Sequence, residues 1–194
     1  ANYWSTIIMQ QELNNALKIL EQGGLIVYPT DTIWGIGCDA TNFDAIQKIY
    51  KLKQREETKS MISIVSDFDM LQTYIEKVPQ AAFDILENTI KPTTIIYDNP
   101  VKVSKNIIAE DNTLAIRVIN EGFAHELIKL FKKPIVSTSA NISNRPSPTS
   151  FKEIDEEILK GVDYVVNLPN LNNSTQASAI IKLSNDGVVN FIRE

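Results

Sequence analysis

Helix-like and strand-like hydrophobic patterns alternate along this chain, and the alternation limits the folds open to it. Leu13, Leu17 and Leu20 recur at helical spacing, and the apolar run 25–28 follows soon after. The same criteria predict helices over residues 11–22, 42–53 (with Thr41 as a cap), 67–75, 80–88, 121–131 and 151–158. They predict strands over residues 25–28, 61–65, 94–97, 113–119, 134–137, 164–167, 177–183 and 188–192. Interleaving of this kind predicts an α/β (α+β) protein with a mixed sheet, and 194 residues suit a single domain over 1–194.

Composition excludes several classes of function. The net charge of −5 argues against a protein built mainly to wrap nucleic acid, although it leaves room for a local basic patch. The single cysteine, Cys38, cannot form an intrachain disulfide, which fits a reducing, cytoplasmic location. The single histidine, His125, disfavours a histidine-based metal site or a histidine-dependent hydrolase, so we predict no protein-bound metal. No apolar run approaches the ~20 residues of a membrane span, so we expect no membrane partner.

The first candidate site segment is residues 26–39, "IVYPTDTIWGIGCD". A buried strand opens there into Pro29, Thr30, Asp31 and Thr32 before the chain turns apolar again. One interpretation is a turn in which Thr and Asp bond the local backbone. The other is a ligand crevice at the end of a strand. On these residues alone the turn is favoured.

The second segment is residues 48–61, "KIYKLKQREETKSM". Lys53, Arg55 and Lys59 lie where the predicted helix runs out into a loop. Cations on a short loop can close around a triphosphate, and arginine does so with two parallel hydrogen bonds. The alternative is a solvated helix end whose charges complement the helix dipole, and taken alone this alternative is favoured.

The third segment is residues 134–149, "PIVSTSANISNRPSPT". Many neutral hydrogen-bonding groups follow a buried strand there, as a nucleotide site would need. If the chain stays extended, Ser139 and Asn141 point to the same side and face the nucleotide together. For the segment as a whole, a polar loop capped by Ser and Asn is an equally good interpretation. For Ser139 and Asn141 the alternative is that both cap the turn 142–146, and we favour the nucleotide-facing interpretation.

Together, in this order and at these distances, the three segments resemble the YrdC/TsaC family of threonylcarbamoyl-AMP synthases. The matching residues are Pro29, Thr30, Asp31, Thr32, Gly35, Gly37, Lys53, Arg55, Arg117, Ser139, Asn141 and the run Arg145–Thr149. The chain departs from the family pattern at Glu56, where a proline is usual, and in the segments "IKPTT" (90–94) and "ASA" (177–179). The resemblance implies a YrdC-like twisted mixed β-sheet flanked by helices, with a large positively charged cavity.

The resemblance also implies an activity. The family is a class of nucleotidyltransferases that join L-threonine, bicarbonate and ATP into threonylcarbamoyl-AMP and release pyrophosphate. The product serves the threonylcarbamoyladenosine modification of tRNA, so partner proteins of tRNA modification are expected downstream. Mg²⁺ is expected to arrive with ATP. The alternative is a double-stranded RNA or tRNA-binding member of the same fold without synthase activity.

Residue roles follow from the resemblance by position. Lys53 and Arg55 are the expected catalytic residues, placed against the triphosphate. The expected ATP-binding residues are Arg55, Lys59, Thr113, Ser137, Ser139, Asn141, Ser147 and Arg193. The expected threonine-binding residues are Thr32, Arg117 and Ser178, with Arg117 on the carboxylate.

Overall fold

The computed structural model describes residues 3–56, 61–168 and 177–193. Its helices are α1 (Tyr3–Glu21), α2 (Phe43–Lys53), α3 (Phe68–Tyr74), α4 (Gln80–Glu87), α5 (Phe123–Phe131) and α6 (Glu156–Gly161), with 3₁₀ turns η1 (Lys105–Ile107) and η2 (Phe151–Glu153). Its strands are β1 (Ile26–Tyr28), β2 (Gly35–Gly37), β3 (Ile62–Val65), β4 (Thr93–Asp98), β5 (Thr113–Val118), β6 (Ile135–Ser139), β7 (Tyr164–Val165), β8 (Ala179–Leu183) and β9 (Val189–Arg193).

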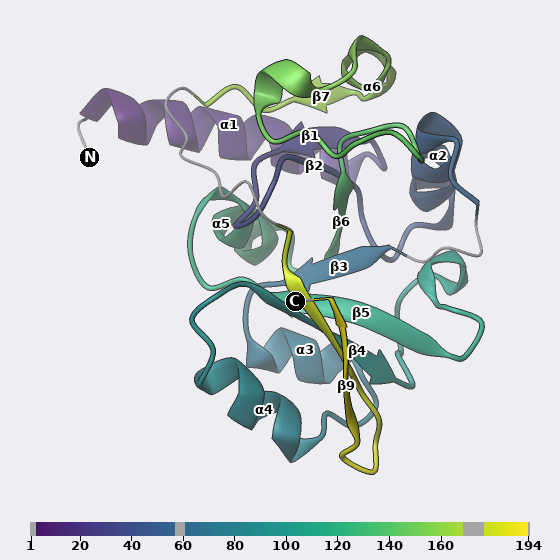
Figure 1. Ribbon diagram of the computed structural model, residues 1–194. Coiled ribbons are helices and arrows are strands. Elements are labelled where there is room, and N and C mark those ends of the chain that lie inside the picture. The colour runs from purple at the N-terminus through teal and green to yellow at the C-terminus, as the bar shows by residue number, and fades with distance from the viewer. Residues whose placement is uncertain (1–2, 57–60, 169–176, 194) are drawn as a thin grey trace.

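The strands of the described residues form one nine-stranded sheet in the order β7-β1-β2-β6-β3-β5-β4-β8-β9. The pairs β1–β7, β3–β5 and β4–β8 are parallel, and the other pairs are antiparallel. The predicted mixed sheet flanked by helices is therefore confirmed (Figure 1).

The two faces of the sheet are covered by different helices, as the residues of β1 illustrate. Ile26 and Tyr28 belong to the apolar cluster that includes α1 and α5, whereas Val27 belongs to the cluster that includes α2. Alternate residues of a strand point to opposite faces, so a short, wholly apolar strand is what a sheet covered on both sides requires. Figure 1 shows α1 beside β1 and β2, with α5 below it and α2 on the opposite side of β6.

Sequence analysis missed or misplaced four features of the fold. Helix α1 begins already at Tyr3, and β2 was not predicted. The segment predicted as one helix over 151–158 divides into η2 and α6. The N-cap of α2 is Asn42, whose side chain accepts a hydrogen bond from Ala45 N–H, rather than Thr41.

Strand β2 depends on its glycines, which explains why hydrophobic pattern alone did not predict it. A Cβ on Gly37 would lie 2.6 Å from the ring of Tyr28 and 2.9 Å from Val136 O. The Tyr28 hydroxyl donates to Val136 O across the same position. Glycine therefore lets β2 fit between β1 and β6 with the tyrosine ring over it. The second glycine of the Gly-x-Gly pattern, Gly37, therefore has a packing role.

Candidate functional site

A cavity of about 300 Å³ brings together residues from all three candidate segments. Eight of the predicted site residues line it: Thr32, Arg55, Arg117, Ser137, Ser139, Ser147, Ser178 and Arg193. Three others, Lys53, Thr113 and Asn141, are not among the lining residues. Lys59 lies outside the described residues.

The end of helix α2 directs Lys53 and Arg55 to different places. Gln54 takes a left-handed conformation (φ 54°), and Arg55 N–H donates to Tyr50 O, as at a Schellman-type helix end. This turn sends the half-buried Arg55 to the cavity, whereas Lys53 stays buried at 1% exposure.

Lys53 contacts the chain that follows β6. Its ammonium donates to the carbonyls of Ser139 and Asn141, the latter at 3.0 Å, and lies 3.5 Å from Ser139 Oγ. Burial, and secondarily the positive charge of Arg55, lowers the pKa of Lys53 to about 7. Lys53 therefore fixes the backbone of the third segment without lining the cavity itself.

The expectation that Ser139 and Asn141 face one way does not hold, because the chain turns between them. Strand β6 ends at Ser139, and Asn141 N–H donates back to Ser139 O at 2.9 Å. Ser139 lines the cavity. The Asn141 amide instead donates to Ile142 O (3.0 Å) and Arg145 O (2.8 Å), which is the turn-capping arrangement. Its buried Oδ1 has no partner among the described residues.

Thr113 is engaged away from the cavity. Its hydroxyl donates to Asp111 Oδ1 at 2.6 Å, and Asp111 also pairs with Lys182 at 2.8 Å. Ala115 and Arg117, further along β5, are the residues of that strand that line the cavity. The ATP role of Thr113 stays a prediction without a supporting contact.

Arg117 is held at one end of the cavity by three oxygen-bearing side chains. Its Nε lies 3.0 and 3.2 Å from the two carboxylate oxygens of Asp31, and its Nη2 lies 3.0 Å from Asp31 Oδ1. Nη2 is also 3.4 Å from Thr32 Oγ1, and Nη1 is 3.5 Å from Thr94 Oγ1. The Arg117 side chain is 3% exposed, and its buried charge is compensated by Asp31.

A chain of hydrogen bonds links Arg117 to Arg193. Thr94 Oγ1 lies 2.7 Å from Ser178 Oγ, and Arg193 Nε donates to Ser178 O at 2.9 Å. Thr94 is fully buried. Sequence analysis assigned no role to Asp31 or Thr94. Both stood in segments compared with the family, but nothing in the sequence showed that each would meet Arg117.

Arginine side chains contribute to the lining of the cavity. Three arginines, Arg55, Arg117 and Arg193, are among its residues, and no carboxylate is among those of the described chain. Burial lowers the pKa of Arg55 and of Arg193, and Arg117 adds to the effect on Arg193. Guanidinium groups stay charged at neutral pH, so Arg55 and Arg193 can bind an anionic ligand, whereas the charge of Arg117 is compensated by Asp31.

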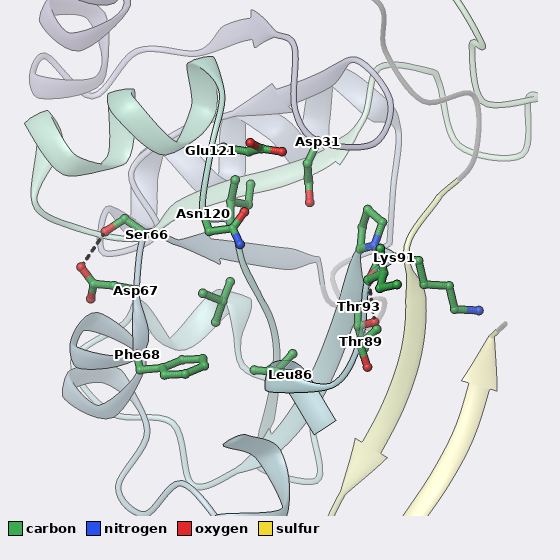
Figure 2. A pocket seen from close by; sticks show the side chains of 14 residues that line it. Asp31, Ser66, Asp67, Phe68, Leu86, Thr89, Lys91, Thr93, Asn120 and Glu121 are labelled. Carbon is green, nitrogen blue, oxygen red and sulfur yellow. Dashed lines mark hydrogen bonds between the residues drawn. The ribbon is translucent and has the colours of Figure 1, made fainter. Parts of the chain in front are cut away.

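A second, larger cavity, of about 550 Å³, is lined by Asp31 but by none of the other motif residues. Figure 2 shows Asp31 and Glu121 on one side of it and Phe68 and Leu86 on the other. Val118 lines this cavity, whereas Arg117 lines the smaller one. Adjacent residues of β5 therefore reach different cavities. We assign the candidate site to the smaller cavity because the motif residues meet there.

Two further properties concern metals and membranes. Among the described residues, no three or more His, Cys, Asp or Glu side chains form a group that could hold a metal ion. No helix in the described part of the chain is long and apolar enough to cross a membrane.

These features define an α/β protein with a mixed sheet and an arginine-lined, hydroxyl-rich cavity. The Sua5–YciO–YrdC family model, described as "Telomere recombination", matches residues 18–194, and the chain belongs to this family.

Curated relatives of similar length carry related names. A threonylcarbamoyl-AMP synthase of Psychromonas ingrahamii is 35% identical over 153 residues, covering 77% of this chain and 80% of the relative. A putative threonylcarbamoyl-AMP synthase of Methanocaldococcus jannaschii is 34% identical over 190 residues, covering 95% of this chain and 88% of the relative.

Solved structures show the same fold. E. coli YciO superposes with a TM-score of 0.81 at 26% identity, covering 95% of this chain and 89% of that one. P. abyssi Sua5, solved in complex with L-threonine, superposes with a TM-score of 0.78 at 26% identity. That alignment covers 88% of this chain and 50% of Sua5, so this chain corresponds to half the length of that protein.

Proposed function

We propose that this protein is an L-threonylcarbamoyladenylate synthase, a nucleotidyltransferase that makes threonylcarbamoyl-AMP and pyrophosphate from threonine, bicarbonate and ATP. The observation that carries the proposal is the smaller cavity, where residues from three distant segments meet and Arg55 and Arg193 can bind anionic ligands. The synthase names of relatives at 31–35% identity support it.

The threonine end of the site is built around Arg117. Its Nη2 atom pairs with Asp31 on one side, but the edge formed by Nη1 and Nη2 has only the hydroxyls of Thr94 and Thr32 at 3.5 and 3.4 Å, so this edge can donate to the amino-acid carboxylate. The hydroxyls of Thr32 and Ser178 are the groups we assign to the amine or hydroxyl of threonine. The L-threonine complex of Sua5 supports an amino-acid site in this fold.

The nucleotide end comprises five of the other lining residues. Arg55 and Arg193 are assigned to phosphate oxygens, and the hydroxyls of Ser137, Ser139 and Ser147 to the nucleotide. Lys53 contributes by fixing the carbonyls of Ser139 and Asn141. Because its pKa is about 7, its amine carries positive charge in only part of the molecules at neutral pH. Mg²⁺ is assigned to the phosphate oxygens of ATP and arrives with it.

The chemistry needs alignment and charge neutralisation rather than a covalent nucleophile on the protein. The threonine amine adds to bicarbonate and water leaves, giving a carbamate. A carbamate oxygen then attacks the α-phosphorus of ATP, and the bond to the β-phosphate oxygen breaks to release pyrophosphate. Arg55 and Arg193 would stabilise the charge that develops on the phosphates. We place the protein in the cytoplasm, where the product supplies tRNA modification.

A pyrophosphate-release assay with substrates omitted in turn tests the proposal. Release should require threonine, bicarbonate, ATP and Mg²⁺ together. Release that ignores threonine would refute the synthase assignment. If no release occurs and RNA binds with a steep salt dependence, the protein is instead an RNA-binding member of the fold.

A further inference from the structure

Asp31 stands between the two cavities and belongs to neither site as assigned above. Its carboxylate lines the larger cavity (Figure 2), while its partner Arg117 lines the smaller one. The Asp31 side chain is 21% exposed and the Arg117 side chain 3% exposed. The ion pair therefore joins a residue at the wall of one cavity to a residue at the wall of the other.

The contacts divide the guanidinium into two edges. Asp31 takes the Nε and Nη2 edge, with donor–acceptor distances of 3.0 to 3.2 Å. The other edge, Nη1 and Nη2, has only the hydroxyls of Thr94 and Thr32 at 3.5 and 3.4 Å. Either edge of a guanidinium can bind a carboxylate with two hydrogen bonds. With the Asp31 carboxylate on the Nε and Nη2 edge, the Nη1 and Nη2 edge can bind a second carboxylate.

We infer that Asp31 is a positioning residue, which holds Arg117 from the side of the larger cavity so that Nη1 and Nη2 face the substrate carboxylate. The inference rests on the proposed function and extends it to the selection of the amino acid. Arginine is long and has several rotatable bonds, so a fixed orientation lowers the entropy lost when substrate binds. Asp31 acts through Arg117 and needs no contact with substrate.

Two other roles for Asp31 predict different behaviour. If the substrate carboxylate had to displace Asp31, removing Asp31 would tighten threonine binding. If Asp31 only stabilised the fold, removing it would lower the melting temperature without a selective effect on threonine. The positioning role predicts weaker threonine binding that a small free carboxylate can reverse, because such an ion can enter through the larger cavity and take the vacated edge of Arg117.

The test measures L-threonine binding to the full chain by calorimetry without ATP, with and without sodium formate. Asp31→Ala should weaken threonine binding at least about ten-fold, and formate should restore most of the loss. Sodium chloride at equal ionic strength should not restore threonine binding. In the pyrophosphate assay the same variant should raise KM for threonine and leave KM for ATP unchanged. Glu121→Gln removes a carboxylate from the same cavity and is the matched control, expected to bind threonine as the wild type does.

Asp31→Asn is the second variant if Asp31→Ala does not fold, as judged by a thermal melt. Asparagine keeps the volume, so its threonine affinity should fall and should not respond to formate. The positioning role of Asp31 would be refuted if both variants bound threonine as tightly as the wild type or more tightly. It would also be refuted if formate did not reverse the loss in Asp31→Ala. Neither result would contradict the proposed synthase function. A wild type that binds threonine but releases no pyrophosphate contradicts the proposed function alone. A wild type that binds no threonine contradicts both.

Discussion

The buried ammonium of Lys53 makes the stability of the protein depend on pH in a predictable direction. Burial lowers the pKa of Lys53 to about 7 in the folded state, against 10.5 for an exposed lysine. Between these two values the unfolded chain binds more protons than the folded chain. The free energy of unfolding must therefore rise with pH across this window, and the Lys53 contribution levels off above the unfolded pKa.

The magnitude follows from the two protonation curves. One pH unit is worth about 1.4 kcal/mol when the folded lysine is fully neutral and the unfolded one fully charged. Integrated from about pH 7 to about pH 8.5, Lys53 adds on the order of 1.5 kcal/mol to the free energy of unfolding. The comparison should not extend above about pH 8.5. Burial raises the pKa of Cys38 and of Tyr28, so these two groups lower the free energy of unfolding as the pH rises further.

Urea unfolding at the two pH values, for the wild type and for Lys53→Met, isolates this contribution. Methionine has similar length and does not titrate, so the rise seen in the wild type should be smaller in the variant by on the order of 1.5 kcal/mol. The absolute stability of the variant is not the readout, since the carbonyls of Ser139 and Asn141 lose a donor. An equal rise in both proteins would show that Lys53 keeps an ordinary pKa and would refute the reasoning.

Two further predictions concern the cavity, and a third concerns the turn that Asn141 caps. Arg55→Ala should lower kcat/KM by the equivalent of about 2–4 kcal/mol with little change in melting temperature, and wild-type turnover would contradict the phosphate role. Threonine should be used far better than valine and modestly better than serine, because a pocket that bonds a hydroxyl rejects a substrate lacking it. Equal use of threonine and valine in the pyrophosphate assay would refute that pocket. Asn141→Ala should cost about 2 kcal/mol of stability, because it loses two hydrogen bonds. ATP affinity, measured by titration beside the melt, should be retained, and a stable variant with weakened ATP binding would reverse this assignment.

Local sequence patterns predicted most of the elements, because periodicity and end signals are local properties. The helix over 42–53 and the strand over 25–28 are examples, and α2 (Phe43–Lys53) and β1 (Ile26–Tyr28) confirm them. Strand β2 was not predicted because it depends on the close approach of Tyr28 and Val136 to Gly37, and a hydrophobic pattern carries no information about such contacts. The sequence did not predict that Lys53 would be buried while Arg55 lines the cavity. This difference depends on the left-handed conformation of Gln54, which is not a glycine and therefore gives no signal in the sequence.

The meeting of the site residues depends on strand register, which is a property of the whole sheet. Thr94 of β4 pairs with Arg117 of β5 on one side and with Ile180 of β8 on the other. This register sets the Thr94 hydroxyl beside both Arg117 and Ser178, although the three residues come from distant segments. Because side chains alternate between faces, a slip of one residue in β5 would turn Arg117 toward the larger cavity and bring Val118 toward the smaller one. The motifs therefore identify candidate side chains for the site, whereas the register of β4 with β5 and β8 determines whether these side chains come together. For the same reason the contacts of Asp31 and Thr94 with Arg117 can be recognised only in the assembled sheet.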